Sequence, residues 1–443
     1  MISRILSGKL PRGNVSLAAL AVAMATGSVL TFTALEAPAS AQTRAERQQA
    51  QRAERQQAQG QYSEAFVAAY RPVAELLNAT PRDAAALRAA APSIAAAIST
   101  PDDKLAGGQF IYSAGRENSD NAMQLQGLSL MLESGKLPPQ SLGEINFVAG
   151  QLAFQAQDYG RARSYLMASV QAGYTANDPH LLIAETHFQQ NDTAGGLAYL
   201  SQQIERQIAA GQTPASEYIR KGLATAYTGD NKAEAIRFAQ MFAQYHPSAD
   251  SWGDAVVVTR SSGDFTDDDM LDLLRLQRAT KTFREGREYL SYVEFADPRR
   301  LPNEVQQVID EGYASGKLDR GNTFASEALT TARARQGQLT GDFAGLERDA
   351  NASGARLATV MAAGNVALDL GQYAKAEGFY RRALTMPGAD TATVLNRMGI
   401  AQVNQGKYAD AVATFNQVEG SRAAVSKLWA TYAQQRAGGA TGA

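Results

Sequence analysis

The sequence predicts an all-α protein, an α-solenoid in which helix-turn-helix units stack into a right-handed superhelix. The main observation is a pair of segments, Gly364–Ala383 and Gly399–Val418, which repeat one residue pattern at a constant offset of 35 residues (399 − 364). A fixed period between about 20 and 50 residues is typical of stacked supersecondary units. No segment sustains the period-two alternation of half-buried strands. The 443 residues also exceed what one compact core holds.

Each unit of this pair is interpreted as two helices joined by a tight turn. In the second unit, the apolar stripe of the second helix has three- and four-residue steps: Tyr408, Ala411, Phe415 and Val418. Gly406 lies where the first helix should end, because glycine accepts the left-handed conformation of a C-cap. Gly399 lies inside the first helix, where glycine costs about 1 kcal/mol against alanine. We therefore expect Gly399 to permit close approach of the partner helix at the small residue Ala411.

These two units resemble tetratricopeptide repeats, which carry small, aromatic and alanine residues at the same steps. That family has a period of 34, so the offset of 35 implies a slightly longer connector, which contains Pro387-Gly388. Val360 and Leu395 replace the tryptophan that the family often has. The chain is also similar to exported alphaproteobacterial repeat proteins of unknown function. The stretches that carry this second resemblance are Tyr245–Ser248, Asp250–Trp252, Leu271–Leu276 and Val308–Gly312.

The first 41 residues have the composition of a secretory signal peptide. A basic start precedes the apolar run Val15–Leu35, and Ala39–Ala41 offers small residues for cleavage before Gln42. We therefore expect a periplasmic or secreted protein after cleavage following Ala41. The alternative is an uncleaved segment, since residues 15–35 are long enough to anchor the chain in the inner membrane.

The rest of the chain divides by composition. Residues 42–59 read as a polar low-complexity linker, because AERQQAQ occurs twice without a large apolar residue. Residues 60–339 carry diverged repeats, and in one of them Gln157 replaces the turn glycine. Residues 340–355 are predicted as a connector, with a loop over Thr340–Ser353 because of its glycines and acids. Residues 356–436 hold the two well-formed units, and residues 437–443 form a tail.

Composition excludes several function classes. The absence of cysteine excludes disulfides, thiolate metal sites and a cysteine lipid anchor. Without residues 1–41 the chain has 39 basic residues (42 − 3) and 43 acidic residues (44 − 1), a net charge of −4 that argues against nucleic acid. Neither a nucleophile elbow nor a phosphate loop is present. We therefore predict no enzyme and no cofactor.

Two clusters of side chains are candidate metal sites. His180 and His187 share a helix face with Glu185 nearby, but zinc needs three or four ligands at coherent spacing. We expect His180 to cap its helix and His187 to pack between helices.

The second cluster is acidic and comprises Asp264, Asp267, Asp268, Asp269 and Asp272. It lacks the residue order of an EF-hand. Acidic residues are favoured at helix starts, so we expect Thr266 or Asp267 to be the N-cap of a helix that includes Met270–Leu276. No metal site is predicted.

The resemblance to tetratricopeptide repeats implies recognition of a protein or peptide, because the family's first helices line a concave groove. Mapped by repeat position, that groove would present Phe147, Gln151, Phe154, Gln155, Glu185, Phe188, Gln189, Arg220, Tyr227, Asn365, Asp369, Asn396 and Asn404. Amides bond peptide backbone in both directions, and aromatic rings anchor apolar side chains. One subclass of the family grips a C-terminal carboxylate. Asn365 fits that mode, but Met361 stands where it needs a lysine.

The predicted function is therefore a non-catalytic scaffold or adaptor in the cell envelope. Its partner would be a protein or peptide, with no nucleic acid, and with the membrane involved only through an uncleaved signal segment. One alternative is an enzyme accessory or a small-molecule or glycan binder, which requires a deep pocket with converging polar groups. Another is a structural spacer tethered to the membrane.

Overall fold

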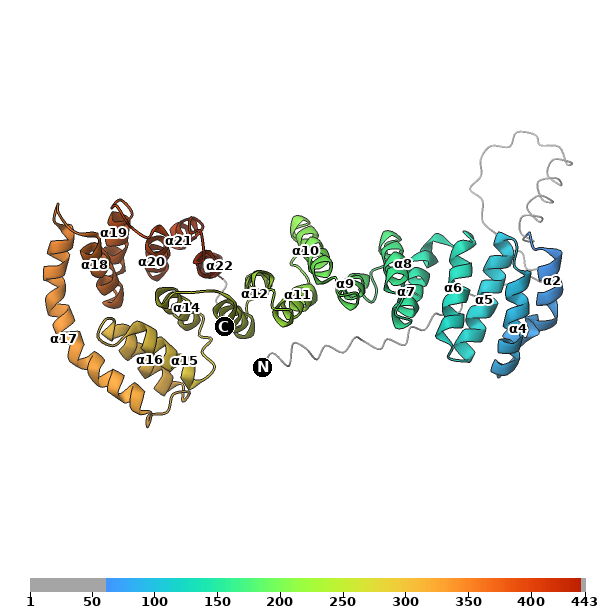
Figure 1. The fold of residues 1–443 in the computed structure, drawn as a ribbon, viewed down its shortest axis with the longest axis horizontal. Coiled ribbons are helices and arrows are strands. Elements are labelled where there is room, and N and C mark those ends of the chain that lie inside the picture. The colour runs from blue at the N-terminus through green and yellow to red at the C-terminus, as the bar shows by residue number, and fades with distance from the viewer. Residues whose placement is uncertain (1–60, 440–443) are drawn as a thin grey trace, which may run out of the picture. The chain divides into compact units, whose positions relative to one another are not determined.

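The computed structural model describes residues 61–439 (Figure 1). The predicted signal peptide, the alternative anchor at residues 15–35, the linker and the last four tail residues lie outside this range. Residues 61–439 form helices and connecting turns without a β-strand, and consecutive helices pack on one another. The predicted all-α solenoid is confirmed. None of the helices between residues 61 and 439 is both long enough and apolar enough to cross a bilayer.

The chain separates into two compact units, with the boundary after Gly196 near the start of α10 (Thr193–Ala209). The described part of unit 1 begins with short helices and continues as longer ones. Its elements are α2 (Glu64–Tyr70), η2 (Arg71–Val73), α3 (Ala74–Asn78), α4 (Ala84–Ala97), α5 (Pro101–Glu117), α6 (Asn121–Glu133), α7 (Pro139–Gln155), α8 (Tyr159–Gln171) and α9 (Pro179–Gln189).

Unit 1 is held together by contacts between neighbouring hairpins. Helices α5 and α6 approach so closely that a Cβ atom on Gly127 would lie 2.4 Å from the backbone nitrogen of Tyr112. The turn between α7 and α8 places Gln157 at φ 61°, so this residue takes the left-handed turn position as predicted. Asp103 on α5 is fully buried and accepts hydrogen bonds from the backbone nitrogen and hydroxyl of Ser63, which fixes the start of α2 against α5.

Unit 2 contains the remaining helices. They are α11 (Ser216–Thr228), α12 (Lys232–Tyr245), α13 (Ala249–Ser262), α14 (Asp267–Ala279), α15 (Gly286–Ala296), α16 (Pro302–Ala314), α17 (Thr323–Asn351), α18 (Leu357–Asp369), α19 (Tyr373–Ala383), α20 (Thr391–Asn404), α21 (Tyr408–Phe415) and α22 (Ala423–Ala437). The 35-residue pair forms α18–α19 and α20–α21, and Gly406 has the expected positive φ of 75°.

The helical glycines of the pair have a different partner from the one predicted. A Cβ atom on Gly399 would lie 2.5 Å from the Phe415 ring, and one on Gly364 would lie 2.7 Å from the Tyr380 ring. The glycine therefore receives the large ring of the second helix rather than allowing approach at Ala411. This arrangement buries Tyr380 and Phe415 almost completely.

The predicted loop at Thr340–Ser353 is wrong. Helix α17 continues through it to Asn351 as a single element of 29 residues, about 44 Å long. Its buried side chains Leu339, Phe343 and Ala350 lie at three- and four-residue multiples, so one face packs on the core. This periodicity outweighs the glycines, and Gly341 and Gly345 face open space.

Unit 2 also closes on itself, which a simple stack of repeats does not do. Helix α22 packs against α20 and also against α12, α13 and α14, which precede it by more than 140 residues (Figure 1). Gln435 donates to the carbonyl oxygen of Ala243 at 2.9 Å and accepts from the Trp252 ring nitrogen at 3.2 Å. The last helix of the chain therefore completes the unit's interior.

Candidate functional site

Helix α14 positions the acidic cluster that the sequence singled out. Thr266 is its N-cap, and the Asp269 carboxylate accepts a hydrogen bond from the Thr266 backbone nitrogen in a capping box, so the cap prediction is confirmed for Thr266. The carboxylates of Asp268, Asp269 and Asp272, however, also pair with arginines from distant helices. The full set, called the acid–arginine network below, is Asp268, Asp269, Asp272, Arg275, Arg397 and Arg422.

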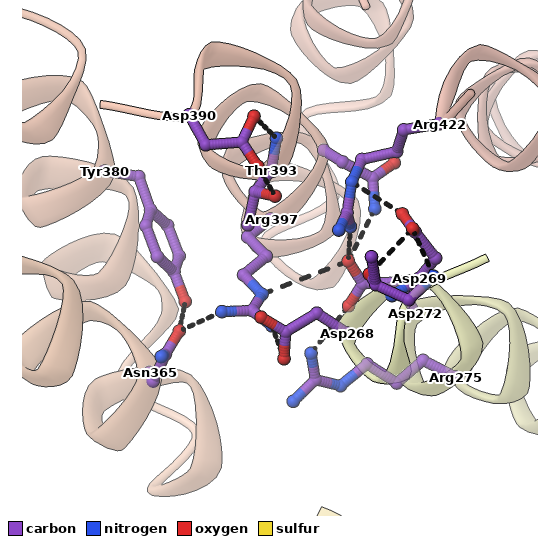
Figure 2. Close-up of polar contacts among 12 residues, drawn as sticks. Asp268, Asp269, Asp272, Arg275, Asn365, Tyr380, Asp390, Thr393, Arg397 and Arg422 are labelled. Atoms are coloured by element: carbon purple, nitrogen blue, oxygen red, sulfur yellow. Dashed lines mark hydrogen bonds and ion pairs between the residues drawn. The ribbon is translucent and has the colours of Figure 1, made fainter. Parts of the chain in front are cut away.

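Asp272 is the centre of the acid–arginine network (Figure 2). Its carboxylate is fully buried and accepts hydrogen bonds from Arg275 Nη1, Arg422 Nη1 and Asn396 Nδ2, each at 2.8 Å. The Asp272 carbonyl oxygen accepts from the Trp429 ring nitrogen at 2.9 Å. One residue of α14 thus binds groups from α20 and α22, which is what closes unit 2.

The outer acids of the network hold the other arginines. Asp268 pairs with Arg397 Nη2 at 2.7 Å, and Asp269 pairs with Arg422 Nε at 2.7 Å. Burial by itself would raise the pKa of Asp268, but the charge and hydrogen bond of Arg397 lower that pKa overall. The contact with Arg397 therefore favours the ionised form of Asp268.

A second ion pair extends the network toward α16. Arg275 binds Glu304 through two hydrogen bonds of 2.9 and 2.6 Å, and the Tyr292 hydroxyl donates to Glu304 at 2.8 Å. Burial opposes the ionised form of Glu304, yet the Arg275 charge lowers its pKa overall. Burial raises the pKa of Tyr292. Arg275 is thus bidentate to one acid while it also bonds Asp272.

Asp369 belongs to α18 but caps the start of another helix, α16. It ends α18, and its Oδ1 accepts from the Glu304 backbone nitrogen at 2.8 Å while Oδ2 accepts from Asn303 Nδ2 at 2.8 Å. Helix α16 has no side-chain cap of its own at Leu301, so Asp369 supplies it. Burial raises the pKa of Asp369 to about 6, assisted by the Glu304 charge and opposed by the hydrogen bonds.

These groups border a cavity of about 780 Å³ in unit 2, called the central cavity below. Helices α14, α15, α16, α18 and α20 contribute side chains to its wall. Arg278 binds Glu311 at 2.6 Å and Gln307 at 2.9 Å along one side. Phe283 and Ile400 provide apolar surface. The central cavity therefore combines converging polar groups with apolar contacts, which is typical of ligand sites.

The predicted groove residues differ in exposure. The buried ones are Phe147, Asp369 and Asn396. The partly buried ones are Gln151, Phe154, Glu185, Phe188, Tyr227 and Asn365. The exposed ones are Gln155, Gln189, Arg220 and Asn404. Phe147 packs on the Tyr174 ring at 5.1 Å and Asn396 belongs to the interior, so neither presents a surface to a peptide.

Two of the predicted groove residues, Asp369 and Asn404, line the central cavity. Sequence reasoning missed the cavity's other polar residues, such as Arg278 and Glu311. The signal that it could have used is the spacing of Arg275 and Arg278, one turn apart on a helix otherwise rich in leucine.

The histidines have structural partners. Asp178 is the N-cap of α9 and accepts from the His180 backbone nitrogen, so the cap is the aspartate rather than His180 as predicted. His187 is partly buried, and its Nδ1 lies 2.7 Å from Asp192 Oδ2. Within residues 61–439, no group of three or more histidine or acidic side chains is arranged to hold a metal ion.

Comparisons with known proteins add little to this geometry. No protein-family model matches the chain, and no curated protein matches it. Among solved structures, the chain is similar to "Crystal structure of APC/C hetero-tetramer Cut9-Hcn1", with 11% sequence identity and a TM-score of 0.22. The match covers 73% of this chain and 66% of the other, just under two thirds of that chain's length. At so low a TM-score, no conclusion about function follows from it.

Proposed function

We propose that this chain is a non-catalytic scaffold of the tetratricopeptide type that binds a protein or peptide segment in the cell envelope. The helical hairpins and the 35-residue pair support the architecture. The composition of residues 1–41 supports export. The observation that carries the proposal is the central cavity, where Asp369 and Asn404, which differ between the two best repeats, meet amides and apolar side chains.

The wall of the central cavity suits a short peptide segment. Its volume of about 780 Å³ lies within the range of ligand pockets. The amides of Gln307 and Asn404 both donate and accept, so they match the two polar groups of a peptide bond. Phe283 and Ile400 would receive an apolar side chain.

Crosslinking followed by mass spectrometry on intact cells tests the proposal. We expect the wild-type chain to yield envelope partners and the double variant Gln307→Ala, Asn404→Ala to lose them. A matched control is Gln417→Ala, because Gln417 is an exposed amide outside the cavity wall that bonds its own helical turn. Partner recovery that is equal for the double variant and the control would count against the cavity.

Unit 1 offers a second surface to the same experiment. Phe154 and Phe188 are partly buried aromatic residues at the predicted groove positions. The double variant Phe154→Ala, Phe188→Ala should reduce partner recovery if the groove of unit 1 binds, whereas Met167→Ala removes an exposed apolar side chain elsewhere and should not. Circular dichroism of each variant checks that helix content is retained.

Export is tested separately. N-terminal sequencing of the protein from the periplasmic fraction should begin at Gln42. A chain that keeps residues 15–35 and sediments with the inner membrane would instead support the tethered spacer.

The central cavity also favours a second candidate, a binder of a small molecule or glycan. Tyr289 and Tyr373 line it beside its paired charges, so its wall suits a polar ring as well as a peptide. Equilibrium dialysis with envelope metabolites would reveal saturable binding that the variant Gln307→Ala, Asn404→Ala loses. Binding of a small molecule without any crosslinked protein would favour this second function.

A further inference from the structure

A second and smaller pocket of unit 2 is lined by arginines. It has a volume of about 220 Å³. Four separate segments bring the five side chains together: Arg275 from α14, Arg299 and Arg300 before α16, Arg335 from α17, and Arg397 from α20. No acidic side chain lines it within the part of the chain that the structure describes. This pocket is called the arginine pocket below.

Two of these arginines are paired with acids that do not themselves line the pocket. Arg275 bonds both Asp272 and Glu304, and Arg397 pairs with Asp268 at 2.7 Å. These short contacts hold the two guanidinium groups in place. They also leave the carboxylates of Asp272, Glu304 and Asp268 already paired.

The other three arginines are only weakly neutralised. Arg300 lies 3.7 Å from Asp268, which Arg397 already binds. Arg335 lies 3.6 Å from Asp342, whose side chain is 72% exposed, and such exposed pairs contribute little. Arg299 makes no ion pair with any residue in the range 61–439. The arginine pocket therefore has an excess of positive charge.

Asn365 adds a neutral donor to the wall. Its Oδ1 accepts from Arg397 Nη1 at 3.1 Å and from the Tyr380 hydroxyl at 2.9 Å (Figure 2). Because both donors converge on the amide oxygen, the orientation of the amide is fixed, and Nδ2 supplies two further N–H groups. The pocket thus combines donors with positive charge.

We propose that the arginine pocket binds a tetrahedral oxyanion, a phosphate or sulfate group. Planar guanidinium groups bind such anions through paired hydrogen bonds. A doubly charged anion balances three weakly paired arginines better than a singly charged carboxylate does. The volume of about 220 Å³ admits one such group with solvent. The arginine pocket shares Arg275 with the central cavity, but its other lining residues are different and the proposal does not depend on the proposed scaffold function.

Isothermal titration of the full chain with inorganic phosphate, sulfate and acetate at constant ionic strength tests the site. Phosphate and sulfate should bind saturably and acetate at least tenfold more weakly. The double variant Arg299→Gln, Arg335→Gln removes two guanidinium groups from the pocket and should weaken phosphate binding about tenfold or more. Both side chains lie outside the buried network, so the fold should be retained. Arg333→Gln is the control, since Arg333 is an exposed residue of α17 that does not line the pocket.

Vesicles distinguish a free anion from a lipid headgroup. Flotation with phosphatidylglycerol vesicles, compared with phosphatidylcholine vesicles, should depend on the same arginine pair if a lipid phosphate is the ligand. Free-phosphate binding without vesicle binding identifies a soluble ligand. The proposal is overturned if neither arm shows saturable binding, or if Arg333→Gln weakens binding as much as the double variant does.

Discussion

Unit 1 and unit 2 are built from the same kind of helical hairpin but are held together differently. In the described part of unit 1, the side-chain hydrogen bond with the largest sequence separation joins Gln61 to Asp102, which are 41 residues apart. In unit 2, Gln435 bonds Ala243 across 192 residues. Asp103 is the one charged side chain of unit 1's described part that is buried, whereas unit 2 buries the whole centre of its acid–arginine network.

This difference separates two sources of order in a repeat protein. Glycine, aromatic and alanine residues at repeating steps are enough to stack each hairpin on the next. They do not specify where a stack ends or whether it meets its own beginning. In unit 2 that information lies in residues that do not repeat, above all Asp272, Arg397 and Arg422.

The largest expected effect comes from removing the centre of the network. Asp272→Ala removes the buried carboxylate that Arg275 and Arg422 both bond, so that these arginines keep only Glu304 and Asp269 as partners. The free energy of unfolding of unit 2 should fall by about 3–5 kcal/mol. Urea denaturation measures the loss in the free energy of unfolding, and hydrogen exchange shows in which unit the loss occurs. As a control, Arg82→Gln in unit 1 removes the exposed pair with Glu117 and an exposed hydrogen bond to the Leu77 carbonyl oxygen, and it should cost less than about 1 kcal/mol. Equal losses in the two units would contradict the contrast drawn between them.

Repeat packing should respond similarly in both units. Gly399→Ala drives a methyl group into the Phe415 ring, and Gly150→Ala in unit 1 drives one into Leu166, so each should cost about 1–3 kcal/mol. Thermal unfolding gives the comparison. Gly378→Ala is the matched control, because nothing lies within 4 Å of that helical position and the alanine should stabilise by up to about 1 kcal/mol. If Gly399→Ala left the stability unchanged, the Phe415 ring would move aside at little cost in free energy.

The two units should also differ in their response to pH. Asp369 has a folded pKa of about 6 against an ordinary value near 3.8, so the folded state holds more protons between these values. Unit 2 should therefore gain about 1–2 kcal/mol as the pH falls from about 6.5 to 4.5. Asp103 in unit 1 has a lowered pKa, because the Ser63 and Thr100 hydrogen bonds outweigh burial, so its contribution is lost only below about pH 4.

Denaturation midpoints measured at several pH values test this opposition. Asp369→Asn should flatten the response of unit 2 in the window from pH 6.5 to 4.5. The lowered pKa of Glu304 acts in the opposite direction, and its contribution begins to be lost only as the pH approaches the ordinary value of 4.5, at the lower end of that window. A response that survives in Asp369→Asn would assign the effect to another group.

The smallest expected effect concerns the outer anchor of α22. Gln435→Ala removes hydrogen bonds to Ala243, Gln244 and Trp252 at the rim of unit 2 and should cost about 1 kcal/mol. Hydrogen exchange should speed up in α22 while α18 and α19 stay protected. Uniform loss of protection throughout unit 2 would mean that closure is a single cooperative event.

The sequence was sufficient for the helices and turns of the repeats. The steps from Gly399 to Phe415 predicted two helices and their turn, and Thr266 was one of the two residues predicted as the cap of α14. The contact that fills the glycine position was misassigned to Ala411, since spacing alone does not show which side chain points at the glycine.

The rest required distances that one sequence does not contain. The aspartates of α14 were explained by helix capping, which is a local reason, so nothing pointed to arginines 125 to 150 residues away. Helix α17 was divided because its glycines outweighed the widely spaced Leu339 and Phe343. The central cavity depends on the closure of unit 2, so of its wall only Asp369 and Asn404 were anticipated, through repeat position.

Closure by the last helix has a consequence for the order of events on the ribosome. Asp272 emerges 150 residues before Arg422, which at about 5–20 residues per second is roughly 8–30 s. For most of that interval Asp268, Asp269 and Asp272 lack both Arg397 and Arg422, and burying carboxylates without their partners is costly, so they stay hydrated. The described part of unit 1 needs no such delay, because its packing partners follow one another closely along the chain. Closure of unit 2 therefore waits for the synthesis of α22, whereas the described hairpins of unit 1 form as each one appears.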